Sequence, residues 1–162
     1  MLRTMRERVV SRASRIGLEV RVRTLDAPTR TVAEAAAAVG CHARQIAKSI
    51  VFIADGDPVV CIASGNHRVD LDRLAEILDV AEVRQATAQE VCAATGFPVG
   101  GVAPLGHDLP LVFDAALLEE RRVFAAGGDG NTLVEVEPRA LAERTRARVV
   151  SLDAAKSPGA AA

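Results

Sequence analysis

Two segments of this chain have the clearest potential for chemistry, and the first is a lysine beside an apolar run. Lys48 directly precedes the run Ser49 to Ala54. Burying an unpaired ammonium is costly, so a lysine at this position needs an anion or another polar partner. The alternative is a side chain whose apolar stem lies along the protein while its charge reaches solvent. The sequence leaves both alternatives open.

The second segment is the loop from Gly96 to Gly106, which has four Gly and two Pro in eleven residues. Proline restricts the backbone, and glycine leaves neighbouring N–H groups unshielded, so a ligand can approach the main chain closely. Backbone N–H groups aimed at a carbonyl or at a water molecule stabilise developing charge without any side chain. A tight connection between a helix and a strand has the same composition, and this alternative also stays open.

Familiar catalytic and metal-binding patterns are missing from the sequence. Residues 127–130 lack the Lys-Ser/Thr ending of a phosphate loop and predict a turn. Cys41 and His42 are adjacent, which is not the spacing of zinc ligands, so we expect no metal and no cofactor. Cys92 has no local catalytic signature and is expected to pack. A Gly-x-Ser-x-Gly motif is absent. Any hydrolysis is therefore expected to rely on positioning and on backbone groups.

The charge of the chain is unevenly distributed. Residues 1–30 contain eight Arg and three acidic residues, a local charge of +5, whereas the formal net charge is −1. This asymmetry indicates either an anionic partner near the N-terminal segment or a solvated helix face. Aromatic residues make up only 2%, which argues against a base-stacking platform, and we expect no DNA partner.

Membrane insertion and secretion are not expected from this sequence. It contains no run of eighteen apolar residues, so no membrane partner is expected. The basic N-terminus lacks the apolar stretch of a signal peptide. The three cysteines are odd in number and widely spaced, which is typical of reduced thiols and predicts a cytoplasmic protein.

Periodicity, caps and turn residues predict an α/β class with a mixed, partly barrel-like β-sheet surrounded by helices. Helices are expected over 2–16, between Thr31 and Gly40, and over 42–47, 71–78, 87–94 and 138–144. Strands are expected over 19–25, 49–54, 58–63, 82–84, 111–113, 122–126, 132–136 and 148–152. A hairpin over 49–63 interrupts the strand–helix alternation, which excludes a doubly wound fold. One domain should span 1–156, followed by a small-residue tail at 157–162 that is expected to be disordered.

Four segments resemble, in order along the chain, the YbaK/prolyl-tRNA synthetase associated domain family. The resemblance covers roughly residues 20–152, and the matching segments are 45–52, 63–70, 95–106 and 125–128. The first contains Lys48, and the third contains a G-x-x-x-P pattern from Gly100 to Pro104. Because these segments occur in the order seen in the family, the match is specific.

The resemblance implies a fold, an activity and partners. Members have a mixed, partly barrel-like sheet with helices around it, and they hydrolyse wrong amino acids from tRNA, mostly tRNA for proline. Some are inserted in prolyl-tRNA synthetase, and others act in trans. Because 162 residues leave no room for a synthetase, we expect a member that acts in trans. The implied partners are the 3′ end of aminoacyl-tRNA and, as a candidate, prolyl-tRNA synthetase.

The resemblance also implies site residues. The essential lysine of the family falls on Lys48, and Gly100 falls on a loop glycine whose backbone orients the reacting ester. The implied substrate-binding residues are Ser49, Gly101, Val102, Pro104, Ala126 and Gly127. Members acting on cysteine have a Tyr before the position of Pro28, and members acting on alanine have a His within 127–131. This sequence has neither, so the resemblance does not assign the amino acid. The alternative function is a non-catalytic tRNA- or nucleotide-binding module on the same scaffold.

Overall fold

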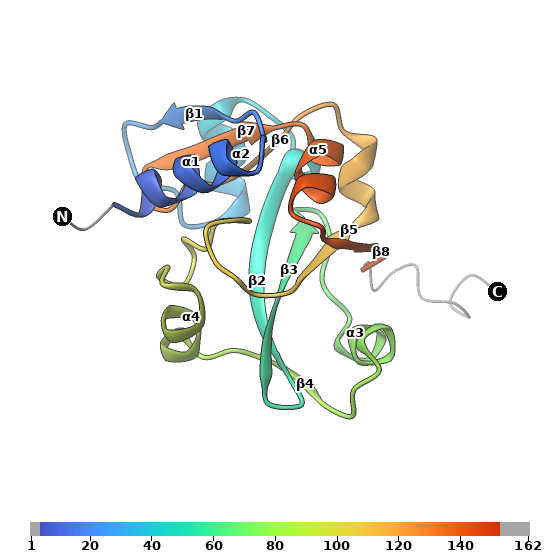
Figure 1. The fold of residues 1–162 in the computed structure, drawn as a ribbon. Helices are drawn as coiled ribbons and strands as arrows, with labels where there is room; N and C mark the ends of the chain where they lie inside the picture. Colours follow the sequence, from blue (N-terminus) through green and yellow to red (C-terminus); the bar gives the residue numbers. More distant parts are fainter. Residues whose placement is uncertain (1–3, 153–162) are drawn as a thin grey trace.

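The computed structural model describes residues 4–152, which form one eight-stranded mixed sheet with helices around it (Figure 1). The strands are β1 (Arg21–Thr24), β2 (Ile46–Ala54), β3 (Asp57–Ser64), β4 (Val83–Gln85), β5 (Leu111–Asp114), β6 (Val123–Ala126), β7 (Thr132–Val136) and β8 (Arg148–Val150). Their order is β1-β7-β6-β2-β3-β5-β8, with β4 also paired to β2. The expected mixed α/β class is confirmed. The sheet is open, because β1 and β8 form its two ends.

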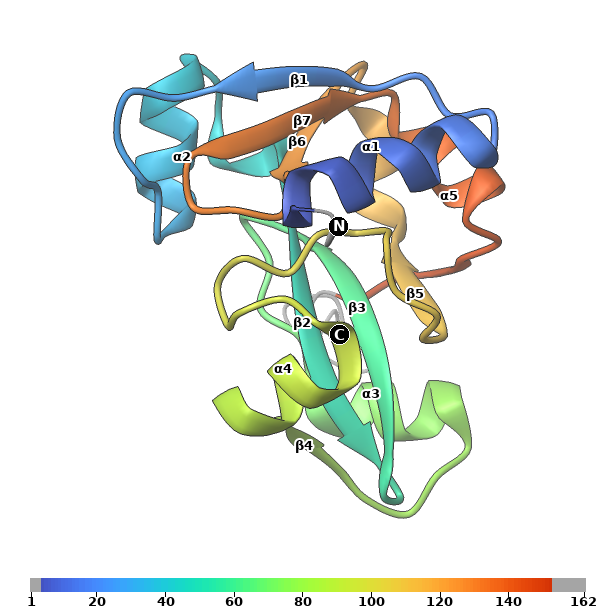
Figure 2. The ribbon, with the colours of Figure 1, turned by 60° about the vertical axis from the view of Figure 1, so that its left-hand side comes forward.

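The hairpin of β2 and β3 is the longest feature of the sheet (Figure 2). Asp55 and Gly56 form its two-residue turn, both with positive φ, at 47° and 90°. Positive φ at both central residues matches the twist of antiparallel strands. The two strands stay paired from Ala54 with Asp57 back to Ala47 with Ser64. The predicted hairpin is therefore confirmed, and its first strand begins at Ile46, three residues earlier than expected.

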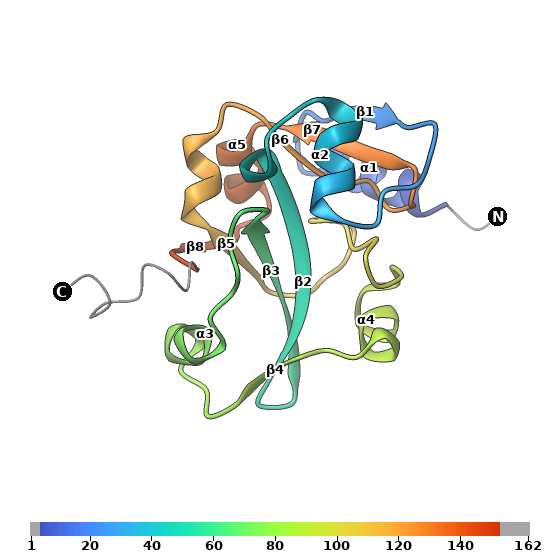
Figure 3. The same cartoon turned by 180° about the vertical axis from the view of Figure 1, so that it is seen from behind.

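Within residues 4–152, five α-helices surround the sheet: α1 (Met5–Arg15), α2 (Val32–Val39), α3 (Leu71–Leu78), α4 (Ala88–Thr95) and α5 (Pro138–Arg144). Local caps fix several of their ends. Thr31, Asp70 and Thr87 each accept a hydrogen bond from a first-turn N–H, as Ser, Thr and Asp do at N-caps. Helices α3 and α4 flank the β2–β3 hairpin on opposite sides (Figure 3).

Two sequence predictions are wrong in detail. The helix expected over 42–47 is only a single 3₁₀ turn, Ala43–Gln45, and Ile46 and Ala47 already belong to β2. Lys48 consequently lies inside a strand and not at a helix–strand junction. Cys92, which was expected to pack, is instead exposed on α4.

Two further expectations concern regions beyond the sheet. The tail at 157–162 and the first residues of the helix expected over 2–16 lie outside the described residues. Within residues 4–152, none of the helices is long and apolar enough to cross a membrane.

Candidate active site

An interruption in strand pairing along one edge of β2 creates the candidate site. Strand β6 pairs in parallel with β2 at Ile46 and Ala47, and β4 pairs with the far end from Phe52 to Ala54. In the described part of the chain, no strand covers this edge between the two pairings. The gap exposes the middle of β2. Lys48 and Ser49 are the first residues of this exposed part.

A cavity of about 330 Å³ opens at this gap. Its walls come from parts of the chain that are far apart in sequence: α2 and the segment before it, strand β2, the end of β4 with the residue after it, α4, the glycine–proline loop, and strands β6 and β7. The lining residues are Thr29, Arg30, Thr31, Val32, Ala35, Ile46, Ala47, Lys48, Ser49, Ile50, Val51, Gln85, Ala86, Val91, Val99, Gly100, Val102, Phe124, Ala126 and Leu133. Most of these side chains are apolar, so the few polar groups determine how a ligand would be oriented.

Ser49 presents polar groups to the gap, and residues 4–152 provide no partner for its hydroxyl. Its Oγ is buried without a hydrogen-bond partner among the described residues. The carbonyl of Val51 points to the same edge, where it accepts a hydrogen bond of 3.0 Å from the Ala86 N–H. Backbone groups two residues apart on a strand point the same way, so the Ser49 N–H and C=O also face the gap. A buried hydroxyl without a partner is unfavourable unless a ligand or water completes it.

Lys48 lines the cavity and is only partly exposed to solvent. Burial lowers the pKa of its ammonium, the Asp114 carboxylate raises it, and the charge of Arg68 lowers it further. Asp114 can act on Lys48 because of strand register. Lys48 on β2 pairs with Ala63 on β3. Ile62, the residue before Ala63, pairs in parallel with Phe113, the residue before Asp114. Lys48, Ala63 and Asp114 therefore lie in one row across the three strands. The small Ala63 side chain separates the two charged residues.

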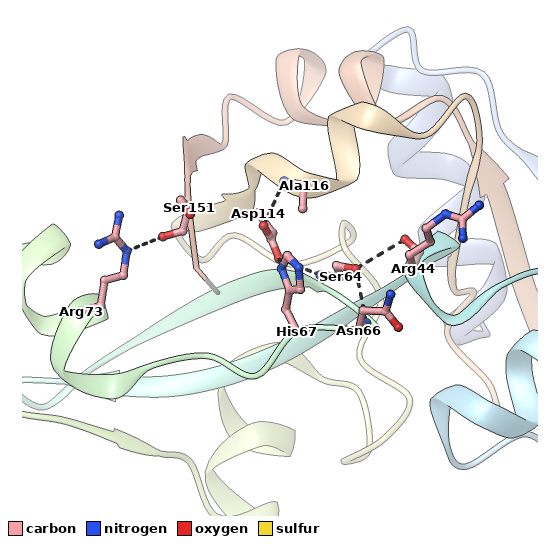
Figure 4. Close-up of polar contacts among 8 residues, drawn as sticks. All are labelled: Arg44, Ser64, Asn66, His67, Arg73, Asp114, Ala116 and Ser151. Carbon is pink, nitrogen blue, oxygen red and sulfur yellow. Dashed lines mark hydrogen bonds and ion pairs between the residues drawn. The ribbon is translucent and has the colours of Figure 1, made fainter. Parts of the chain in front are cut away.

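Asp114 belongs to a buried polar network on this side of the sheet (Figure 4). Its side chain is 1% exposed and accepts hydrogen bonds from the N–H groups of Ser64 and Ala116, each at 3.0 Å. His67 Nδ1 lies 2.8 Å from Oδ2, the carboxylate oxygen that also accepts from the Ser64 N–H. Partners of this kind stabilise the ionised carboxylate. The network therefore holds a fixed negative charge behind Lys48.

The glycine–proline loop brings one free backbone donor to the mouth of the cavity. Gly100 has a φ of +83° and is exposed, and no N–H partner for it is found within residues 4–152. The N–H of Gly101 is already bonded to the Pro98 carbonyl at 3.0 Å. This bond closes a turn that holds Gly100 at its tip, with Val99 beside it at 61% exposure. The Gly100 N–H is thus available to a ligand, whereas that of Gly101 is not.

The structure brings together five of the eight residues implied by the resemblance. The five that line the cavity are Lys48, Ser49, Gly100, Val102 and Ala126, while Gly101, Pro104 and Gly127 lie outside its wall. The Gly127 N–H is also engaged, because it donates to the Thr132 carbonyl at 2.8 Å. The N–H groups of Gly101 and Gly127 are therefore both engaged within the protein.

Sequence reasoning missed several residues of this region. Thr29 to Val32 and Gln85–Ala86 line the cavity, yet they lie far from Lys48 in sequence and form no recognisable motif. The pair of His67 and Asp114 is 47 residues apart. A polar residue that ends a buried strand, such as Asp114 after Leu111 to Phe113, is the only local signal. No group of three or more His, Cys, Asp or Glu side chains in the described ranges is arranged to hold a metal ion.

Comparison with known proteins assigns the chain to a family. A family model described as an aminoacyl-tRNA editing domain matches residues 26–143, which include every residue of the cavity wall. The chain therefore belongs to the aminoacyl-tRNA editing domain family.

Particular relatives are similar over most of this chain. The uncharacterized protein YwhH of Bacillus subtilis is 32% identical over 131 residues, covering 79% of this chain and 83% of YwhH. A proline–tRNA ligase of Solidesulfovibrio magneticus is 36% identical over 106 residues, 64% of this chain but only 18% of the ligase. A solved structure described as a candidate trans-editing enzyme for prolyl tRNA synthetase is 38% identical, with a TM-score of 0.86 over 94% of this chain and 99% of that one.

Proposed function

We propose that this protein is a trans-acting deacylase that hydrolyses the ester between a wrong amino acid and the 3′-terminal ribose of tRNA, with tRNA for proline as the expected substrate. The observation that supports this most is the cavity at the gap in β2. There the unpartnered Ser49 hydroxyl, the free Gly100 N–H and the Lys48 ammonium surround one apolar space. Family membership and the similarity to proline–tRNA ligases favour this substrate class over other esters.

The reaction needs a water molecule, a stabilised oxyanion and a protonated leaving group. Water attacks the ester carbonyl carbon, the bond to the ribose oxygen breaks, and that oxygen takes up a proton as the amino acid leaves. The N–H groups of Gly100 and Ser49 would donate to the carbonyl oxygen as it becomes negative. Lys48 would hold the phosphate of the terminal nucleotide or polarise the carbonyl. The neighbouring ribose hydroxyl would position the water, and catalysis would then rest on geometry and electrostatics.

Selectivity would come from the size of the apolar wall around the amino acid. Val51, Val91 and Val102 are buried and line the cavity with branched side chains that repack little. A methylene in such a pocket changes binding by only about 1–3 kcal/mol. The cavity should therefore admit several small amino acids and reject large ones by steric exclusion.

A panel of mischarged tRNAs tests this function. Transcribed tRNA for proline is charged in separate reactions with Ala, Ser, Cys, Thr, 2-aminobutyrate and Pro, and release of free amino acid is measured with and without the protein. We expect release of at least one small non-cognate residue and little release of proline. Binding of charged tRNA without release from any member would instead identify a non-catalytic tRNA-binding module on the same scaffold.

A further inference from the structure

Helix α1 contacts the start of the glycine–proline loop, although it lies before residue 26, where the family match begins. The guanidinium of Arg8 lies over the ring of Phe97, 5.1 Å from its centroid. Phe97 is completely buried, so this contact joins α1 to a fixed point of the core. A side chain at Gly96 would collide with the same guanidinium. Arg8 therefore lies against the point where the chain leaves α4 and enters the loop.

The end of the same loop is held one turn further along α1. Arg12 Nη1 donates to the carbonyl of His107 at 3.1 Å, and Nη2 contacts Asp108 Oδ1 at 3.0 Å. The His107 ring is buried, and its Nδ1 accepts a hydrogen bond from the Leu109 N–H at 3.2 Å. Between these two anchors Val9, fully buried, packs near Gly106. One face of α1 thus contacts both ends of the segment that presents Gly100.

The first turn of α1 also lies against the turn that follows β6. Gly128 has a φ of +106°, and a Cβ placed on it would lie 2.7 Å from the carbonyl carbon and oxygen of Met5. Such close packing of backbone on backbone requires glycine at this position. This turn directly follows Ala126, which lines the cavity. Helix α1 therefore touches two of the segments that border the candidate site.

We infer that α1 is a brace for the active site, and that Arg8 and Arg12 are positioning residues that fix the Gly100 loop for the reaction. The catalytic half of this inference rests on the proposed function. The two arginines differ from others on the same helix: Arg6 and Arg15 are exposed, whereas Arg8 and Arg12 are half-buried and contact the loop and the residues after it. The arginine-rich N-terminus thus contains structural cations, and a solvated or tRNA-binding role for the whole set does not fit this geometry.

The order of the loop can be measured without any substrate. Hydrogen exchange of the Gly101 and Leu109 amides is suitable, because each donates a hydrogen bond inside the held segment. In Arg8→Gln and Arg12→Gln, we expect these amides to exchange roughly tenfold faster than in the unchanged protein, while amides of the β2–β3 hairpin keep their protection. Arg15→Gln is the matched control and should leave loop exchange unchanged. Equal exchange in all variants would refute the brace, whether or not the protein is a deacylase.

Kinetics on two substrates then separate bracing from tRNA docking. Deacylation is measured on full-length mischarged tRNA and on the aminoacyl ester of a CCA trinucleotide, which lacks the acceptor stem. We expect Arg8→Gln and Arg12→Gln to lower kcat by on the order of tenfold on both substrates, with KM little changed. Arg12→Lys keeps a charged donor for the His107 carbonyl and should recover much of kcat.

The remaining outcomes are distinct. A higher KM on full-length tRNA only, with normal turnover of the trinucleotide ester, would overturn the brace and identify these arginines as docking residues. A loop that exchanges faster while kcat stays unchanged would also overturn their role in positioning. Failure of the unchanged protein to hydrolyse either substrate would contradict the proposed function itself, and this result is seen before any variant is compared.

Discussion

At the scale of single residues, Lys48 combines a cation with an environment that disfavours its charge. Burial lowers the pKa of its ammonium below the usual 10.5, and only Asp114 acts in the opposite direction. A lysine held this way destabilises the free protein slightly but provides a desolvated positive charge for an anionic ligand. This is a typical compromise between stability and function.

The same argument predicts that Lys48→Met does not destabilise the fold. The pKa of Lys48 is lower in the folded protein than in the unfolded chain. At every pH below the folded pKa, including pH 7, the charged ammonium therefore lowers the free energy of unfolding. Removing the ammonium relieves this cost, and solvent screening keeps the effect small. We expect the free energy of unfolding at pH 7 to be unchanged or raised by less than about 1 kcal/mol in urea titrations. A clear loss of stability would mean that Lys48 is a structural ion-pair partner.

His107 should make the protein sensitive to acid. Its pKa is lowered to about 4 by burial first and then by the charges of Arg12 and Arg8. Between pH 6.5 and about 4, His107 binds a proton in the unfolded chain but not in the folded protein. Stability is therefore lost as the pH falls from 6.5 to about 4. The shift corresponds to about 3 kcal/mol over the full window.

The measurement compares urea unfolding at pH 7, 5.5 and 4 for the unchanged protein, His107→Gln and His42→Gln. His107→Gln should be less stable at pH 7 because a buried hydrogen bond is altered, but its stability should fall less on acidification. His42 is exposed, so its replacement should leave the pH dependence as it was. Parallel pH profiles for all three proteins would show that His107 does not retain its neutral form in the fold.

At the scale of elements, local signals predicted most helices and the central hairpin. Thr31, Asp70 and Thr87 cap their helices, and Asp55–Gly56 forms the hairpin turn, because these interactions involve residues close in sequence. The prediction failed at Ile46 and Ala47, where local composition favoured a helix. Pairing with β3 and β6 places both residues in a strand, and such long-range pairing overrides weak local preference.

The loop at Gly100 offers a matched test of backbone geometry. Gly100 and Gly56 have φ values of +83° and +90°, and an added Cβ would meet nothing within 4 Å at either position. Alanine should therefore cost a similar amount of stability at both sites, about 1–2 kcal/mol from backbone strain alone. Gly100→Ala should lower deacylation at least tenfold, because the loop shifts to relieve this strain, whereas Gly56→Ala should retain full activity. Equal activity of the two variants would show that the Gly100 loop is only a connector.

At the scale of the whole molecule, the candidate site exists only after the chain has folded. The cavity wall combines the segment before α2, the middle of β2, the residues after β4 and the Gly100 loop. No sequence pattern predicts that β6 and β4 leave the middle of β2 uncovered, because this depends on where two distant strands end. Family resemblance located Lys48 and Gly100, but the free Ser49 groups and the Asp114 network emerge only from the assembled sheet.

The most direct test of the central claim is single-turnover hydrolysis of mischarged tRNA for proline by the unchanged protein and by Lys48→Met. Circular dichroism and urea unfolding first establish that both proteins are folded. We predict that the unchanged protein releases a small non-cognate amino acid well above the rate without protein, and that Lys48→Met is slower by at least about a hundredfold. Comparable release by both proteins, or no release by either from any member of the panel, would contradict an ester-hydrolysing site at the gap in β2.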